Sequence, residues 1–278
     1  MNVTVEQTLS RSVELLPRSA TPKLDVEILL QYTLGVNQAK LYAYPERVLT
    51  QTEQTIFAKH LRRRQVGEPI AYIVGEKEFF SLPLKITADV LVPRPETELL
   101  VELVLQLLPQ DKKVRLIDLG TGSGAIALAL AHNRPNWEIY ASDKSSAALS
   151  IAKENADHLQ LGNIQFIQSD WCATLPTQQY DLIVSNPPYV DPMDAHLQSD
   201  GLLFEPQSAL VADDEGFADL FIIAEQAGSF LHKDGWLLLE HGNQQGEKLA
   251  NYLREKGFSD VSAHLDLAGQ VRATLARY

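Results

Sequence analysis

Residues 114–131 read VRLIDLGTGSGAIALALA, an apolar run followed by a glycine-rich turn and a second apolar run. This order predicts a buried strand that turns through glycines into a helix. Glycine lets the backbone turn tightly and approach a ligand closely, and the amino terminus of the helix then faces that ligand. A second predicted strand, 137–142, ends at Asp143, where an acid suits two ribose hydroxyls. These features predict a nucleotide-type site at one edge of a sheet.

The glycine pattern alone does not identify the cofactor. Gly120-x-Gly122-x-x-Ala125 also satisfies the dinucleotide fingerprint, so a nicotinamide-dependent dehydrogenase is one candidate. In either case, the turn is expected to pass under the cofactor through Gly120, Thr121, Gly122, Ser123 and Gly124.

A second motif follows another apolar run. Residues 182–185 read LIVS and predict a buried strand that ends in Asn186-Pro187-Pro188-Tyr189. Prolines contribute carbonyls but no N–H, and they fix φ, so this loop is stiff and presents acceptors. The Asn186 side-chain oxygen and the Pro187 carbonyl suit a planar NH2 group, against which the Tyr189 ring could stack. We therefore expect Asn186, Pro187 and Tyr189 to act in catalysis and 186–189 to bind substrate. A rigid turn that merely ends a strand is the structural alternative.

The periodicity changes along the chain. Apolar residues recur at helical spacing between 5 and 16, and further helical patterns follow, so we expect a helical domain over 1–73. A β-hairpin linker is expected over 74–93, and a cofactor-binding domain over 94–278. Strands and helices alternate in that last part. Alternation predicts a mostly parallel sheet covered on both faces, with ligands at the carboxyl ends of its strands.

Composition excludes several classes of protein. The net charge of −12 repels nucleic acid over most of the surface. The single cysteine, Cys172, excludes internal disulfides and has no His or Cys neighbours at ligand spacing, so no metal site is expected. The chain shows neither a membrane-spanning apolar run nor a signal peptide. We therefore expect a cytoplasmic protein with no membrane partner and no direct nucleic-acid substrate.

Together the motifs resemble the class I S-adenosylmethionine-dependent methyltransferases that modify exocyclic or amide nitrogens. More specifically, the chain resembles the release factor glutamine methyltransferase (PrmC/HemK) family. The Asn-Pro-Pro-Tyr motif is shared with DNA adenine methyltransferases, whereas PRPETE at 93–98 is more particular to the glutamine enzymes. The resemblance is carried by residues 91–98, 118–124, 185–189 and 204–210.

The resemblance implies a Rossmann-like, mostly parallel seven-stranded sheet with a small N-terminal helical bundle domain. Because that helical part contains no glycine loop and no strand-end acid, we expect it to dock the protein substrate and not to build the cofactor pocket. The resemblance also implies methyl transfer from S-adenosylmethionine to the glutamine side-chain amide nitrogen in the Gly-Gly-Gln motif of class 1 peptide chain release factors. Asp143 is then expected at the cofactor ribose and Trp171 at the adenine, with Asn186 between cofactor and substrate.

Three other functions stay open at this point. A DNA or RNA adenine methyltransferase would use the same acceptors on an exocyclic amine, although the acidic charge opposes it. A nicotinamide dehydrogenase does not explain Asn-Pro-Pro-Tyr, and a non-catalytic factor-binding protein does not explain the intact motif set. Two roles are also open: Arg94 either contacts a partner or braces loops, and Arg62–Arg64 either ends a helix favourably or binds a partner.

Overall fold

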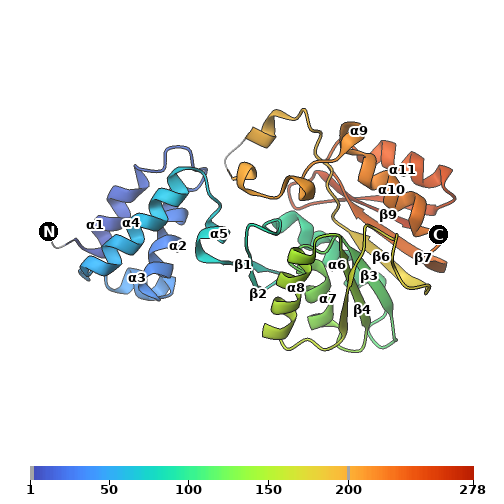
Figure 1. Cartoon of the computed structure of the whole chain (residues 1–278), viewed down its shortest axis with the longest axis horizontal. Coiled ribbons are helices and arrows are strands. Elements are labelled where there is room, and N and C mark those ends of the chain that lie inside the picture. The colour runs from blue at the N-terminus through green and yellow to red at the C-terminus, as the bar shows by residue number, and fades with distance from the viewer. Residues whose placement is uncertain (1–2, 199–200) are drawn as a thin grey trace. The chain divides into compact units, whose positions relative to one another are not determined.

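Seven strands form one sheet in this protein, whose computed structural model describes residues 3–198 and 201–278 (Figure 1). The strands lie in the order β5-β4-β3-β6-β7-β9-β8. Strands β3 to β7 pair in parallel, and β9 runs antiparallel to both of its neighbours. The mostly parallel seven-stranded sheet that the sequence predicts is thus confirmed. The strands are β3 (Arg115–Leu119), β4 (Glu138–Asp143), β5 (Ile164–Gln168), β6 (Tyr180–Ser185), β7 (Leu231–Glu240), β8 (Ser259–Leu265) and β9 (Val271–Arg277).

Helices cover both faces of this sheet, as Figure 1 shows for α7 and α8 on one face and α10 and α11 on the other. The alternating pattern explains this arrangement, because parallel strands are joined by helices that must pack back onto the sheet. Residues 125–131 of α7 are all buried. The helices are α6 (Glu98–Leu107), α7 (Ala125–Asn133), α8 (Ser146–His158), α9 (Asp213–Gly216), α10 (Ala218–Ala227) and α11 (Gly246–Glu255), with short 3₁₀ turns η1 (Pro95–Thr97) and η4 (Gln207–Ala209).

The boundary between α10 and β7 depends on a distant strand. The sequence pattern suggests a helix over 217–231, but α10 ends at Ala227 and β7 already begins at Leu231. Leu231 pairs with Tyr180 of β6, so a contact between distant strands overrides the local helical pattern.

The strand order reverses between β3 and β6. These strands are neighbours in register, with Leu119 beside Ser185, and Leu119 also pairs with Ser142 of β4. Gly120 and Asn186 follow these strands directly, and Asp143 is the last residue of β4, so all three lie at the same edge of the sheet. A crevice at such a reversal point, outside the carboxyl ends of the strands, is where open α/β sheets bind ligands.

The chain forms two compact units, of which the second comprises Lys77–Asp194 and Glu205–Tyr278. The hairpin strands are β1 (Glu76–Phe79) and β2 (Leu82–Lys85). Asn155 of α8 accepts a hydrogen bond from the Lys85 N–H (2.7 Å) and donates to the Lys85 carbonyl (3.1 Å). The segment expected as a linker, 74–93, is thus divided, with 77–93 belonging to the sheet-containing unit.

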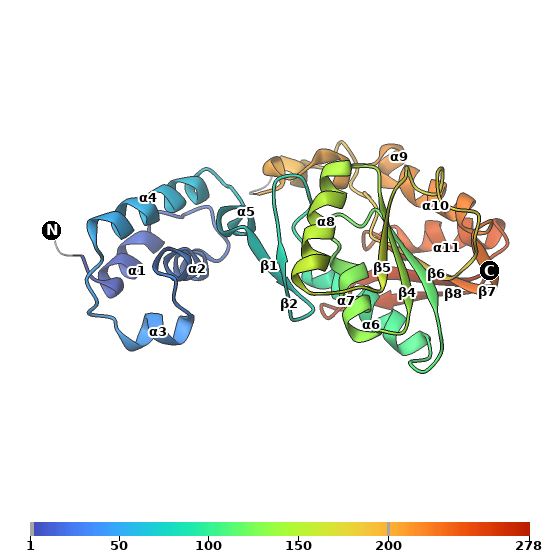
Figure 2. The same cartoon turned by 60° about the horizontal axis from the view of Figure 1, so that its bottom comes forward.

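The first unit is a bundle of helices comprising Met1–Glu76 and the segment Ala195–Phe204. Helix α2 lies against α1 and α4, and their buried faces form a separate apolar core (Figure 2). Arg63 pairs with Glu68 and Arg64 with the buried Asp25, so two of the three basic residues act within the bundle. The elements are α1 (Val5–Val13), α2 (Pro22–Leu34), α3 (Gln38–Ala43), α4 (Gln51–Gln65), α5 (Ile70–Val74), η2 (Ala195–Gln198) and η3 (Leu202–Phe204).

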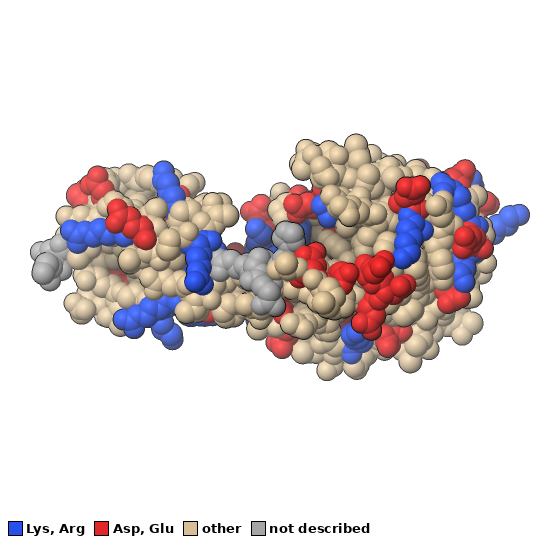
Figure 3. All heavy atoms as spheres, turned by 90° about the horizontal axis from the view of Figure 1, so that it is seen from above, with Lys and Arg blue, Asp and Glu red and all other residues tan. Residues whose placement is uncertain are grey.

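The charge is unevenly distributed on the sheet-containing unit. Figure 3 shows acidic side chains gathered side by side on the face of this unit that it presents. Within the described residues, no helix is both long and apolar enough to cross a membrane. The same residues contain no group of His, Cys, Asp and Glu placed to hold a metal ion.

Candidate active site

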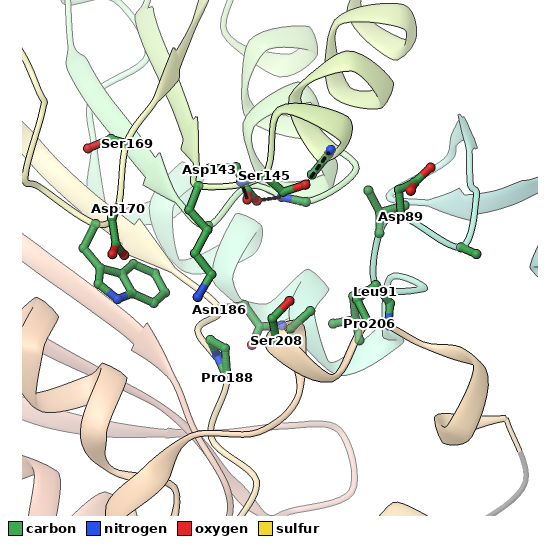
Figure 4. Close-up of a pocket in the computed structure, with 18 residues that line it drawn as sticks. Asp89, Leu91, Asp143, Ser145, Ser169, Asp170, Asn186, Pro188, Pro206 and Ser208 are labelled. Atoms are coloured by element: carbon green, nitrogen blue, oxygen red, sulfur yellow. Dashed lines mark hydrogen bonds between the residues drawn. The ribbon is translucent and has the colours of Figure 1, made fainter.

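A pocket of about 300 Å³ opens at the carboxyl edge of the sheet (Figure 4). Three parts of the second unit form it: the glycine turn, the ends of β4 to β6, and two loops at 88–91 and 206–209. Six of the residues expected at the site line this pocket: Gly120, Gly122, Asp143, Trp171, Asn186 and Pro188. Four further polar residues that no sequence motif marked also line it: Asp89, Ser145, Ser169 and Ser208.

The glycine turn is shaped to pass under a ligand. Gly120 and Gly122 have φ of +71° and +55°, a region that side chains rarely adopt. A Cβ on Gly120 would lie 3.2 Å from the Trp171 ring, whereas a Cβ on Gly122 would meet no atom within 4 Å. Any side chain at Gly122 would therefore project into open space that a ligand can occupy.

Three residues of the turn have other partners. The Thr121 hydroxyl donates to Asp118 Oδ2 (2.6 Å), and the Ser123 carbonyl accepts from Asn155 (2.9 Å). Gly124 caps the amino terminus of α7 with φ of +88°. None of Thr121, Ser123 and Gly124 lines the pocket, so any contact that they make with a cofactor stays a prediction.

Asp118 lies buried beneath the turn. Burial raises the pKa of its carboxyl to about 7, because the charged form is poorly solvated there, and the nearby charge of Asp143 adds to this. The Thr121 hydroxyl and the Ala127 N–H act in the opposite direction on this pKa. Through Thr121, Asp118 supports the turn from below.

Asp143 has a structural role as well as a place in the pocket. Its Oδ2 accepts from the Gly122 N–H (2.9 Å) and its Oδ1 from the Ser145 N–H (2.8 Å). A carboxylate oxygen can accept more than one hydrogen bond, so both oxygens can also receive ribose hydroxyls. The same residue thereby orders the glycine turn and offers acceptors to a ligand.

We expect Asp143→Ala to weaken S-adenosylmethionine binding by roughly 1.5–3 kcal/mol, or about 10- to 150-fold in Kd, because a charged hydrogen-bonding partner is lost. Isothermal titration calorimetry measures this change. Asp157→Ala is the control, because it removes one negative charge from an exposed position on α8 and should leave the affinity unchanged. Equal affinity of Asp143→Ala and the wild type would exclude Asp143 from the cofactor site.

Trp171 forms a flat wall of the pocket. Its ring lies against Gly120, and its Nε1 donates to Asp219 Oδ1 (3.0 Å). The hydrogen bond fixes the orientation of the indole, so the ring can stack on a planar group without further ordering.

Asn186 is oriented by a hydrogen bond at its nitrogen. Its Nδ2 donates to the Thr97 hydroxyl oxygen at 3.0 Å, and no described residue donates to its Oδ1. Pro187 and Pro188 are buried, and only Pro188 lines the pocket. Asn186 therefore offers the pocket an acceptor, whereas a role for the Pro187 carbonyl stays a prediction.

Tyr189 lies behind the Asn-Pro-Pro loop and does not line the pocket. Its hydroxyl donates to Glu240 Oε1 (3.1 Å), and its carbonyl accepts from Gln245 Nε2 (3.1 Å). Burial and the neighbouring Glu240 charge raise the pKa of its phenol, which keeps it neutral. These bonds hold the loop to the sheet, and stacking of Tyr189 on a substrate stays a prediction.

The two motif segments 91–98 and 204–210 meet through one ion pair. Arg94 Nη2 donates to Glu205 Oε1 (2.6 Å), and the Val92 N–H donates to Glu205 Oε2 (3.1 Å). The Glu205 side chain is 2% exposed and that of Arg94 33%. Of the two roles considered for Arg94, the structure supports the bracing of loops, since Leu91 and Pro206 beside this pair line the pocket.

Glu205→Ala should destabilise the sheet-containing unit and weaken cofactor binding. Removing one partner of a buried pair costs about 3–5 kcal/mol, and we expect the lower end because Arg94 is partly exposed. Glu154→Ala is a matched control, because it breaks the exposed Lys85–Glu154 pair and should cost under about 1 kcal/mol. Urea unfolding measures both. Equal stability of the two variants would contradict the bracing role.

Two polar residues that contact the Asn-Pro-Pro-Tyr loop were not predicted as site residues. Thr97 lies within the PRPETE segment, and Glu240 ends the apolar run 236–240. The sequence did contain a signal for Glu240, because it is a polar residue at the end of a buried strand. The same kind of position had pointed to Asn186. What the sequence lacked was the adjacency of β6 and β7, which places Glu240 beside Asn186.

Family models match both units of the chain. The model described as "PrmC N-terminal domain" matches residues 7–75, and the one described as "Methyltransferase small domain" matches 97–226. The chain is 48% identical to the release factor glutamine methyltransferase of Coxiella burnetii, over 98% of each chain. It is also 46% identical to the enzyme of that name from Shewanella oneidensis, over 96% of this chain and 93% of the relative. The identity to the Escherichia coli enzyme of that name is 46% as well, over 97% of each chain.

Solved structures of methyltransferases share the fold. The T. thermophilus 16S rRNA N2 G1207 methyltransferase, solved with AdoMet and guanosine, aligns with a TM-score of 0.53 at 20% identity, over 73% of this chain and 49% of that one. A ribosomal protein L11 methylase from Lactobacillus delbrueckii subsp. bulgaricus aligns with a TM-score of 0.50 at 20% identity, over 66% of this chain and 80% of that one. At this identity the likeness establishes the Rossmann-like fold alone.

Proposed function

Because this chain belongs to the release factor glutamine methyltransferase family, we propose that it methylates the side-chain amide nitrogen of a release-factor glutamine and that Asn186 holds that nitrogen. The target is the glutamine of the Gly-Gly-Gln motif in class 1 peptide chain release factors. Such a substrate places the reaction in the cytoplasm, where translation terminates.

One observation carries the assignment of Asn186. Its Nδ2 donates to Thr97, no described residue donates to its Oδ1, and Asn186 lines the pocket beside the stiff Pro187-Pro188 segment. A primary amide brings two N–H donors in one plane. Asn186 Oδ1 accepts one of them, and the Pro187 carbonyl is the acceptor for the other.

The same pocket suits the cofactor. The Gly120–Gly124 turn gives close backbone approach, Asp143 offers acceptors for ribose hydroxyls, and Trp171 offers a flat wall for adenine. When bound, S-adenosylmethionine supplies an activated methyl group on a sulfonium. The residues then have to position the nucleophile.

That nucleophile is weak, because an amide nitrogen shares its lone pair with the carbonyl. Two acceptors on its N–H bonds stabilise positive charge as it develops on nitrogen. Orientation of this kind can account for several kcal/mol, up to roughly 7–11 in ideal cases. The proton leaves after transfer, when the nitrogen is acidic, so no strong general base is needed at Asn186.

An adenine methyltransferase acting on DNA or RNA is the second candidate, because an exocyclic amine presents the same two hydrogens. The net charge of −12 and the acidic side chains in Figure 3 oppose a phosphate backbone. A nicotinamide-dependent dehydrogenase is not supported, because hydride transfer does not require the acceptors that the Asn186 loop presents.

The deciding experiment is a methyl-transfer assay with the full chain, labelled S-adenosylmethionine, and either a class 1 release factor or duplex DNA. We expect label in the release factor alone, and peptide mapping to place it on the glutamine side-chain nitrogen. A release factor with that glutamine replaced by alanine is the control. Label in DNA, or in the control factor, would contradict the proposal.

A further inference from the structure

A buried carboxylate lies directly behind Asn186. Glu240 ends β7 and is 1% exposed, and its neighbour Leu239 pairs with Ser185, which precedes Asn186. The Tyr189 hydroxyl donates to Glu240 Oε1, whereas Oε2 is buried with no fully formed hydrogen bond among the described residues. The Thr97 hydroxyl interacts with this carboxylate and lowers its pKa more than any other neighbour does.

Thr97 therefore stands between Asn186 and Glu240. Its oxygen accepts from Asn186 Nδ2, and a hydroxyl has only one hydrogen of its own to donate. An ionised carboxylate can only accept, so in its interaction with Glu240 the Thr97 hydroxyl is the donor. The Thr97 oxygen then has only lone pairs to offer Asn186. Only the NH2 end of the Asn186 amide can donate to them.

We propose that Glu240 is a positioning residue which, through the Thr97 hydroxyl, holds the Asn186 amide with its oxygen toward the substrate. The inference rests on the proposed function, because it concerns the acceptor that holds the glutamine nitrogen. It makes Glu240 a determinant of specificity: an acceptor facing the pocket favours a primary amide and disfavours a carboxylate. A release factor with glutamate in place of the target glutamine is thus rejected.

The charge on Glu240 should also shape the pH dependence. Burial raises its pKa to about 7, the charge of Glu96 in η1 adds to this, and Thr97, Tyr189 and Arg272 of β9 act in the opposite direction. The ionised form enforces the orientation, so we expect the methylation rate to fall as pH falls through about 7. In Glu240→Gln this inflection should be absent, because glutamine does not titrate.

The test measures binding of two release factors, one with the native glutamine and one with glutamate, to the full chain saturated with S-adenosylhomocysteine at pH 8.5. The wild type should bind the glutamine factor at least about tenfold more tightly than the glutamate factor. This ratio of the two Kd values should decrease several-fold in Glu240→Gln and in Thr97→Val. Thr97→Val is the sharper variant, because it breaks the link yet keeps the Glu240 charge. Thr97→Ser retains the hydroxyl and should restore the ratio.

Non-additivity separates positioning from a merely structural effect. Because Glu240 acts through Thr97, the double variant Thr97→Val/Glu240→Gln should have the same ratio as Thr97→Val alone. An unchanged ratio in Thr97→Val, or additive effects in the double variant, would overturn the positioning role. If Asn186→Ala itself keeps the wild-type ratio, the proposed function of Asn186 fails; if it loses the ratio while Thr97→Val keeps it, only the role of Glu240 fails.

Discussion

We expect Asn186→Ala to lower methylation of a release factor by about a hundred- to a thousand-fold, the usual cost of removing one preorganised partner of developing charge. Cofactor affinity should change far less, because the glycine turn, Asp143 and Trp171 are untouched. Single-turnover assays with labelled S-adenosylmethionine measure the first effect, and calorimetry measures the second. A wild-type rate in this variant would refute the mechanism despite the family membership.

Asn186→Asp is the matched comparison, because it keeps the size and an acceptor. The structure adds a reason why it should not match the wild type. Aspartate cannot donate to Thr97, whose single hydrogen would then be shared between two carboxylates, one of them the buried Glu240. We expect the methylation rate of Asn186→Asp to lie above that of Asn186→Ala and below that of the wild type. A rate lower than that of Asn186→Ala would contradict this order.

Deleting Met1–Glu76, the N-terminal part of the first unit, should abolish efficient methylation of a release factor while leaving cofactor binding nearly intact. We expect kcat/KM to fall at least about a hundred-fold, which corresponds to roughly 3 kcal/mol of lost transition-state binding, because remote contacts with a substrate help to position its reacting group. The pocket lies wholly in the second unit, so its affinity for S-adenosylmethionine should persist.

The structure places the cut for this experiment at Lys77. A chain that began near Leu91 would lose the hairpin and the pocket residues Ala88–Val90, and its weak cofactor binding would then reveal nothing about docking. A short Gly-Gly-Gln peptide is the control substrate. Both chains should methylate it equally, since it is too short to need a docking unit. Full activity of the shortened chain on the release factor would contradict a docking role for the deleted helices.

Local patterns in the sequence were enough to predict the fold and several of the residues that line the pocket. Strand, turn and helix at 115–133 follow from a local apolar pattern interrupted by glycines, and the left-handed φ at Gly120 and Gly122 agrees with the residue type. Asn186 was recognisable because a polar residue followed by two prolines ends a buried strand. Such features are local in the chain, and local patterns are what a single sequence reveals.

The hydrogen-bond partners of those residues come from distant parts of the chain and become neighbours only in the folded protein. Asn186 bonds Thr97 across 89 positions, and Arg94 bonds Glu205 across 111. Strand order brings Glu240 beside Asn186, and no periodicity in the sequence predicts which strands become neighbours. Hydrogen bonds between distant segments depend on register to within one residue, because a slip by one residue turns every side chain to the other face. The orientation of the Asn186 amide is therefore a property of the folded sheet.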